Sequence, residues 1–194
     1  MPGWIQFVRQ SLSHPQQVGA ICASSRSMGW TMTDAIGIGD AKNIVELGPG
    51  DGAFTEVILE RMSPDAHLMA VEINPEFSAR LRGRFPQIVV KNGCVSELSK
   101  MLEEEQMGAP EVVVSALPWS VFQEELQDKL LSAVVAAMAV GGRFSTIAYV
   151  SGLFLPPARK FRRKLSQHFE TVECSPIQWK NLPPAITYRC RKGE

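Results

Sequence analysis

A glycine-rich turn follows a short apolar run near residue 50 of this 194-residue chain. The run is Asn43–Leu47, and Gly48, Gly50 and Gly52 occupy alternate positions directly after it. Glycine lets the backbone turn tightly and approach a ligand that a Cβ atom would repel. Glu72 lies at the end of the next apolar run, where a carboxylate can accept both hydroxyls of a ribose. A strand before the turn, a helix after it and an acid at the next strand end together predict a site for a nucleoside-containing cofactor.

The same turn admits two cofactors. Gly48-x-Gly50-x-x-Ala53 also satisfies the dinucleotide fingerprint, which leaves a nicotinamide cofactor open. Glu46 lies two residues before the first glycine, where an acid can bind the amino group of a cofactor through backbone or water. The resulting pattern, Glu-x-Gly-x-Gly-x-Gly, resembles motif I of the class I methyltransferases. A dinucleotide enzyme needs a second mononucleotide half, for which 194 residues leave little room, so S-adenosylmethionine is the cofactor that we expect.

Apolar runs alternate with amphipathic stretches between residues 41 and 194, which predicts one α/β domain with a mostly parallel sheet. Strands are expected over residues 43–47, 67–73, 87–91, 111–115, 143–150, 169–174 and 185–190, and helices over residues 53–62, 76–84, 96–106, 122–139 and 158–167. Residues 1–40 are expected to form an N-terminal helical arm that contacts the membrane and closes over the cofactor. Ligands of parallel sheets bind beyond the carboxyl ends of the strands, so chemistry is expected from the residues after each strand.

Four further segments extend the resemblance over most of the chain. The arm sequence Phe7–Met28, the acid-containing segment Val71–Phe77, Ser115–Pro118 (SALP) and Trp179–Arg189 (WKNLPPAITYR) are similar to the bacterial phospholipid N-methyltransferases, which methylate phosphatidylethanolamine. The last segment is long and unusual, so it is the most specific. The resemblance implies a Rossmann-like class I methyltransferase fold, with a seven-stranded, mostly parallel sheet, an antiparallel last strand and helices on both faces.

The resemblance also implies which residues form the cofactor site. The residues expected to bind S-adenosylmethionine are Ser24, Ser25, Glu46, Gly48, Pro49, Gly50, Gly52, Glu72, Ile73, Gly93, Cys94, Val95, Ser115, Ala116 and Leu117. One of them departs from the family pattern, since Cys94 stands where the family usually has Asp after Gly93. A thiol is a weak hydrogen-bonding group, so we expect the adenine contact to come from the backbone near Cys94 and Val95.

Methyl transfer from a sulfonium needs a neutral nucleophile held against the methyl group. Orientation of the two reactants alone can lower the activation barrier by about 7–11 kcal/mol. Tyr149, at the end of the fifth expected strand, is the candidate catalytic residue that orients the amine through its hydroxyl or ring; the alternative is a rim residue without a role. Trp119 is expected either to wall the substrate pocket or to pack in the core. The three histidines are scattered and the four cysteines isolated, so no metal site is predicted.

Three other functions stay open. A ribosomal RNA adenine N6-methyltransferase shares the glycine motif and the acid after strand two, but its motif after strand four begins with Asn or Asp to grip the target amino group. This chain has Ala116 there, which places nucleic acid below lipid as the substrate. A small-molecule methyltransferase is the next alternative. A non-catalytic module that binds S-adenosylmethionine is the last, and only the missing acid at residue 94 points to it.

The formal net charge is zero, with 20 basic and 20 acidic residues, but its distribution is uneven. Residues 1–128 hold 9 Lys and Arg against 17 acids, whereas residues 129–194 hold 11 against 3. Five of these cations lie within six residues, and each contributes on the order of 1 kcal/mol near anionic lipid. They are Arg159, Lys160, Arg162, Arg163 and Lys164. A solvated helix face or an RNA-binding patch would show the same run of charge.

An apolar stripe in the arm is a second indication of a membrane. Trp4, Val8 and Leu12 recur at helical spacing, so this helix either lies in the membrane interface or packs on the domain. No apolar run reaches the roughly 18–20 residues that span a bilayer, and no secretory signal is recognised. We therefore expect a cytoplasmic enzyme with peripheral contact at the inner face of an anionic membrane. Its substrate would be a phospholipid amine, and no obligate protein partner is evident.

Overall fold

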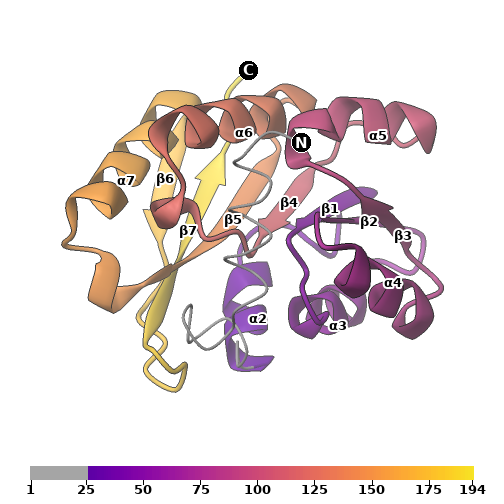
Figure 1. Cartoon of the computed structure of the whole chain (residues 1–194), viewed down its shortest axis with the longest axis horizontal. Coiled ribbons are helices and arrows are strands. Elements are labelled where there is room, and N and C mark those ends of the chain that lie inside the picture. Colours follow the sequence, from indigo (N-terminus) through magenta and orange to yellow (C-terminus); the bar gives the residue numbers. More distant parts are fainter. Residues whose placement is uncertain (1–25) are drawn as a thin grey trace.

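Short runs of aliphatic residues form the strands of an open sheet within residues 26–194, the part of the chain that the computed structural model describes (Figure 1). The strands are β1 (Asn43–Leu47), β2 (His67–Glu72), β3 (Val89–Asn92), β4 (Val112–Ser115), β5 (Arg143–Tyr149), β6 (Thr171–Cys174) and β7 (Ala185–Arg191). Their order in the sheet is β3-β2-β1-β4-β5-β7-β6. Strands β1 to β5 are parallel, and β7 is antiparallel to both of its neighbours, which confirms the predicted fold.

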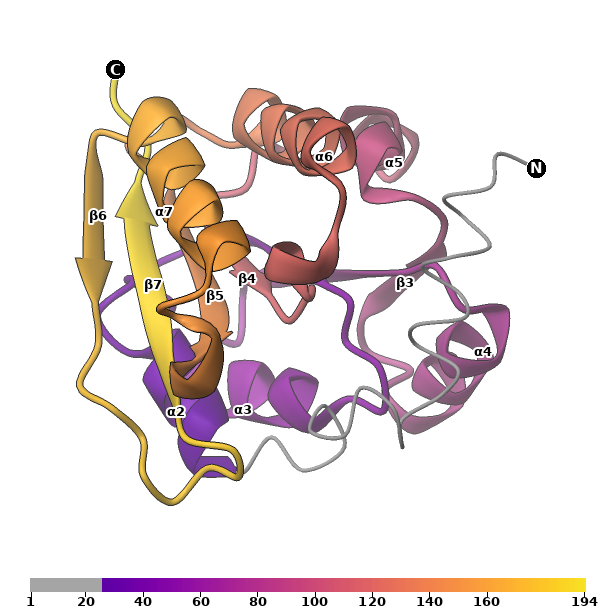
Figure 2. The same ribbon diagram turned by 60° about the vertical axis from the view of Figure 1, so that its left-hand side comes forward.

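Helices cover both faces of this sheet (Figures 1 and 2). One face carries α2 (Arg26–Thr33), α3 (Ala53–Arg61) and α4 (Pro75–Arg84), and the other carries α5 (Leu98–Glu104), α6 (Glu124–Ala137) and α7 (Pro156–His168). Single 3-10 turns follow three strands, namely η2 (Val95–Glu97) after β3, η3 (Trp119–Val121) after β4 and η4 (Val150–Gly152) after β5. The expectations for Trp4, Ser24 and Ser25 lie outside the described residues.

The central strands are apolar on both faces because both faces are covered. In β1, Val45 and Leu47 pack in the core cluster under α5, α6 and α7, whereas Ile44 packs with Met28 and Met32 of α2 on the opposite side. Successive side chains of a strand point to opposite faces, so a strand buried on both sides has no polar alternation. This is why β1 and β4 could be predicted from short continuous runs of Val, Ile and Leu.

Most element boundaries agree with the sequence prediction, and the differences have local causes. The helix expected over residues 96–106 is divided into η2 and α5. Helix α4 begins at Pro75, where the missing N–H costs nothing, and Asn74 caps it by accepting a hydrogen bond of 2.9 Å from the backbone N–H of Glu76. Helix α7 likewise begins at a proline, Pro156, two residues before the expected start.

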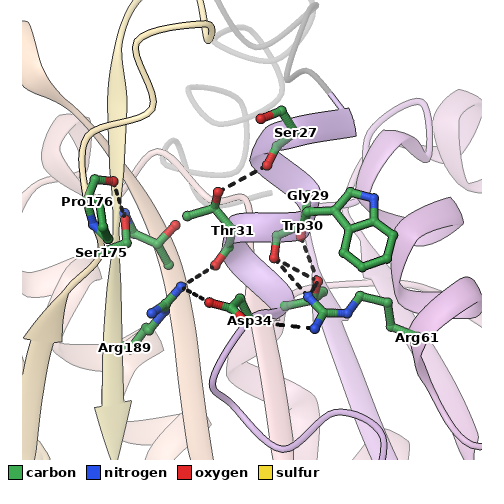
Figure 3. A network of polar contacts seen from close by, with 11 residues as sticks. Ser27, Gly29, Trp30, Thr31, Asp34, Arg61, Ser175, Pro176 and Arg189 are labelled. Atoms are coloured by element: carbon green, nitrogen blue, oxygen red, sulfur yellow. Dashed lines mark hydrogen bonds and ion pairs between the residues drawn. The ribbon is translucent and has the colours of Figure 1, made fainter.

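Helix α2 is attached to the sheet by a polar network (Figure 3). Arg189 of β7 donates from Nη2 to the carbonyl of Thr31 over 3.1 Å and to a carboxylate oxygen of Asp34 over 3.0 Å. Arg61 at the end of α3 donates to the carbonyl of Trp30 over 3.0 Å and to the hydroxyl of Thr33 over 2.9 Å. Met28, Met32, Ile36 and Ile38 add apolar contacts with residues of the sheet, so residues 26–40 pack on it.

Among residues 26–194, no helix combines the length and the apolar character needed to cross a bilayer.

Candidate active site

The strand order reverses between β1 and β4, and the residues after these two strands face each other there. The backbone N–H of Ala116 donates to the carbonyl of Leu47 over 2.9 Å, and the N–H of Gly48 donates to the carbonyl of Val71 over 2.9 Å. These bonds bring the segments after β1, β2 and β4 to one edge. In open α/β sheets this crevice is where ligands bind.

Each glycine of the turn has a positive φ, at +68° for Gly48, +59° for Gly50 and +90° for Gly52. A Cβ on Gly48 would lie 2.7 Å from Cδ2 of Leu117, and one on Gly52 would lie 2.4 Å from Cε2 of Phe85. A Cβ on Gly50 would have no atom within 4 Å. The first and third glycines therefore allow close packing, while the second leaves an open cradle with its backbone exposed toward a ligand.

The carboxylate of Glu72 accepts hydrogen bonds from this turn and from the segment after β2. The residue is only 2% exposed. Its Oε2 accepts a hydrogen bond of 3.1 Å from the N–H of Gly50, and its Oε1 accepts one of 2.7 Å from the N–H of Asn74. Burial raises the pKa of Glu72 and these backbone N–H groups oppose the rise. Each oxygen keeps a second lone pair, which suits the two hydroxyls of a ribose.

A narrow cavity adjoins Glu72 and contains most of the residues expected near the adenosine. Its walls include Gly48, Glu72, Ile73, Gly93, Cys94, Val95 and Leu117. Ile73, Val95 and Leu117 supply apolar sides, which suit the two faces of a planar base. These residues fit the cofactor that the sequence predicted.

Cys94 uses its side chain as a helix cap. Its Sγ accepts from the backbone N–H of Ser96 over 3.4 Å and from the hydroxyl of Ser96 over 3.1 Å, at the start of η2. The N–H of Gly93 donates to the carbonyl of Glu72 over 3.1 Å. The thiol therefore organises the loop, and the backbone beside it lines the cavity.

Glu46, Ser115 and Ala116 were expected at the cofactor but do not line this cavity. Glu46 is fully buried, and its Oε2 accepts a hydrogen bond of 2.6 Å from Oγ1 of Thr55 in α3. Burial raises the pKa of this carboxyl to about 8. Ser115 is also fully buried, and its hydroxyl accepts from the indole N–H of Trp119 over 3.0 Å. The Ser115 hydroxyl also accepts from the backbone N–H of Leu117 over 3.4 Å, and Pro49 is buried.

A second cavity of about 220 Å³ lies beyond the ends of β4 and β5. Its walls include Phe54, Ala116, Leu117, Trp119, Val121, Ile147, Tyr149, Ser151, Leu153 and Phe161. Leu117 lines both cavities, so the two adjoin, and we refer to the second as the acceptor cavity. Tyr149 is the last residue of β5 and lines the acceptor cavity.

Trp119 packs in the core, and its role at the substrate stays a prediction. The indole is 2% exposed, stacks on the ring of Phe161 at 5.3 Å and meets Phe122 and Phe144 edge to face. It also lines the acceptor cavity. The sequence analysis did not single out Ser151 and Leu153, which directly follow β5. The rule that ligands lie beyond strand ends would have found them.

The basic run on α7 is less free than its sequence suggests. Lys164 is 9% exposed and donates to Asp128 over 2.6 Å and to the carbonyl of Glu124 over 3.0 Å, so it is not a surface cation. Lys160 is exposed but forms an ion pair with Glu124. Arg162 is half-buried, with its guanidinium 5.5 Å from the centre of the Tyr188 ring. Arg159 and Arg163 are exposed and form no ion pair with residues 26–194.

The sheet order, the antiparallel β7, the glycine turn after β1 and the acid at the end of β2 define a class I methyltransferase that uses S-adenosylmethionine. The protein belongs to the ribosomal RNA adenine dimethylase family, whose model matches residues 30–150. It is an S-adenosylmethionine-dependent methyltransferase, and the non-catalytic alternative falls away.

Three relatives show how this similarity is distributed. The ornithine lipid N-methyltransferase of Singulisphaera acidiphila is 30% identical, covering 98% of this chain and 97% of its own length. The ribosomal RNA small subunit methyltransferase A of Synechococcus sp. is 24% identical, covering 83% of this chain and 66% of its own length. The crystal structure of the N-methyltransferase NodS from Bradyrhizobium japonicum in complex with S-adenosyl-L-homocysteine superposes with a TM-score of 0.71 at 16% identity, covering 98% of each chain. This last likeness confirms the fold.

Proposed function

We propose that this protein methylates the amine of a lipid headgroup, such as phosphatidylethanolamine or an ornithine lipid. The observation that carries the proposal is the wall of the acceptor cavity at residue 116. Ala116 lines this cavity and offers no side-chain group that could grip the exocyclic amine of a base. The walls are mainly apolar, which suits an amine attached to a lipid. Similarity to an ornithine lipid N-methyltransferase over nearly the whole chain supports the same substrate class.

The cofactor would be held by the residues after β1, β2 and β3. Glu72 would accept the ribose hydroxyls, the backbone of Gly48 to Gly52 would approach the methionyl part, and Ile73, Val95 and Leu117 would enclose the adenine. When bound, S-adenosylmethionine supplies a methyl group on a positively charged sulfur, a leaving group that needs no further activation. The protein therefore has to orient the acceptor rather than activate the donor.

Tyr149 would orient the amine in the acceptor cavity. Its hydroxyl can accept a hydrogen bond from a neutral amine, which keeps the nitrogen lone pair directed at the methyl group. The ammonium form of the substrate must lose its proton to solvent before transfer. This role makes Tyr149 a catalytic residue whose removal slows transfer without weakening the cofactor.

Arg159 and Arg163 would attract the enzyme to anionic lipid, since they are the exposed α7 cations without an ion pair among the described residues. On this basis we propose that the enzyme works in the cytoplasm, at the inner face of a membrane.

The test is incubation of the protein with radiolabelled S-adenosylmethionine and three acceptors in parallel. The acceptors are mixed vesicles of phosphatidylethanolamine and ornithine lipid, ribosomal RNA, and small water-soluble amines. We expect label in the lipid fraction, with separation of the products identifying the headgroup, and Tyr149→Phe lowers the rate in that arm. Label found in RNA alone, for which the family match at residues 30–150 argues, or in the small amines alone, overturns the proposal.

A further inference from the structure

Two loops meet at the carboxyl edge of the sheet, beside the acceptor cavity. Strand β5 ends at Tyr149 opposite Ala185, the first residue of β7. The N–H of Val150 then donates to the carbonyl of Pro184 over 2.9 Å. The β5–α7 loop and the β6–β7 loop are thereby joined.

These loops carry most of the exposed large apolar side chains in residues 26–194. Six of the eight lie here or on the adjoining η3, and they are Val121, Phe154, Leu155, Ile177, Trp179 and Leu182. We refer to these six residues as the apolar rim. Phe154 and Leu182 are each 74% exposed, and Trp179 is 69% exposed. Apolar side chains concentrated at one edge indicate an interaction surface.

The β6–β7 loop buries two of its polar side chains and exposes its large apolar side chains. Asn181 is 1% exposed and donates from Nδ2 to the carbonyl of Pro183 over 2.7 Å. Ser175 is 6% exposed, and its hydroxyl accepts from the N–H of Thr187 over 2.9 Å. The polar groups satisfy the backbone of the loop, which leaves Trp179 and Leu182 presented to the surroundings. This inverted arrangement is unfavourable in water and favourable against lipid.

The charge around the rim points to an anionic surface. Residues 144–169 and 175–192 contain no Asp or Glu. Lys180 lies inside the loop, Arg159 and Arg163 follow on α7, and none of the three forms an ion pair with the described part of the chain. Cations flanking exposed aromatic and aliphatic side chains match the layering of a bilayer, with phosphates outside the acyl region.

We propose that the apolar rim inserts into the surface of an anionic lipid bilayer, so that the acceptor cavity opens directly onto the headgroups. The inference rests on the proposed function for its substrate, and it adds the orientation in which the enzyme meets that substrate. Val121 belongs both to the rim and to the cavity wall, and Leu153 of the wall directly precedes Phe154 of the rim. A headgroup amine can therefore enter the cavity while its acyl chains stay in the bilayer.

The experiment measures vesicle binding without cofactor and without any amine substrate. Flotation with vesicles of phosphatidylcholine and phosphatidylglycerol gives the dissociation constant of the full chain and of the double variant F154E/W179E. The matched control is V140E. Val140 is 67% exposed, but it lies just before the amino end of β5, far from the carboxyl ends of the strands. Thermal melting of all three proteins shows that the substitutions leave the fold intact.

We expect the double variant to bind at least about tenfold more weakly and V140E to bind within about twofold of the wild type. Equal binding by the double variant and the wild type overturns the inference, as does a wild type that does not bind. Loss of self-association in the double variant with unchanged vesicle binding also overturns it, and identifies the rim as a contact between copies. Methyl transfer to a water-soluble short-chain phospholipid is measured separately. If vesicle binding depends on the apolar rim but no methyl group is transferred to this phospholipid, the proposed function is refuted and the inferred membrane-binding surface is retained.

Discussion

Replacing Glu46 by Gln tests whether the carboxyl near the end of β1 is neutral in the folded protein. The side chain is fully buried, Thr55 donates to one carboxyl oxygen, and the other oxygen has no partner among the described residues. Burial raises the pKa from 4.5 to about 8, and the charges of Glu72 and Asp51 add to the rise. In the unfolded chain the carboxyl is exposed to water and titrates as an ordinary glutamate.

The direction of the pH effect follows from this difference. Between the unfolded and folded pKa values, from 4.5 to about 8, the folded protein retains a proton at Glu46 that the unfolded chain has lost. The contribution of Glu46 to stability is therefore present in full below the unfolded pKa and is lost as the pH rises through this window. The slope is about 1.4 kcal/mol per pH unit, and the whole loss is on the order of 5 kcal/mol.

The glutamine variant keeps the volume and the acceptor for Thr55 but does not titrate. Urea unfolding of E46Q and wild type, followed by circular dichroism from about pH 5 to pH 8, gives the difference in the free energy of unfolding, in which other titrations cancel. We expect this difference to move steadily in favour of E46Q as the pH rises. T55V is the control, because the Thr55 hydrogen bond lowers the pKa and its loss extends the window to higher pH. A difference that does not vary with pH would refute the assignment of a neutral carboxyl.

Other substitutions test the site and the packing of α2. Glu72→Ala removes the acceptor of two backbone N–H groups beside the cofactor cavity, and we expect calorimetry to show binding of S-adenosylhomocysteine weakened at least about a hundredfold. Unchanged affinity would exclude Glu72 from the cofactor site. Tyr149→Phe is expected to slow single-turnover methyl transfer while cofactor affinity stays within about twofold, and an equal rate would refute its orienting role. Gly48→Ala forces a Cβ to 2.7 Å from Leu117 at a positive φ, so urea unfolding is expected to show a loss of about 2–4 kcal/mol; a loss below that range would mean that the turn relaxes. Arg189→Met breaks the hydrogen bonds to Thr31 and Asp34, and the same measurement is expected to fall by about 1–3 kcal/mol, whereas no change would show that α2 is held by its apolar face alone.

The sheet could be predicted well because its signals are local. Strands such as β1 and β4 are continuous apolar runs bounded by glycine, proline or acid, and the helices between them carry apolar residues at helical spacing. The glycine turn and Glu72 were identified for the same reason, since their types and spacing follow directly from the elements around them. The sequence analysis did not predict helix α2 as a separate element within the arm. Its place depends on Arg61 and Arg189, which are distant in the sequence.

The roles of individual polar side chains required the tertiary structure. Lys164 and Arg163 are neighbours in one basic run, yet Lys164 is buried against Asp128 and Arg163 is exposed, because α6 packs on only one side of α7. Ser115 and Ala116 are likewise adjacent at the end of β4. The serine hydroxyl faces the indole of Trp119 in the core, whereas the alanine lines the acceptor cavity.

The sequence alone therefore determined the class of fold, the cofactor turn and the edge of the sheet at which chemistry occurs, because periodicity and glycine positions act over a few residues. Only the tertiary structure decided which acid lines the cofactor cavity and which is buried away from it. Glu46 and Glu72 both stand at or near the ends of parallel strands. Helix α3 covers the first and raises its pKa to about 8, while the second keeps its carboxylate at the cavity, held by the backbone N–H groups of Gly50 and Asn74. Desolvation depends on what packs against a side chain, and that is set by contacts between segments far apart in the chain.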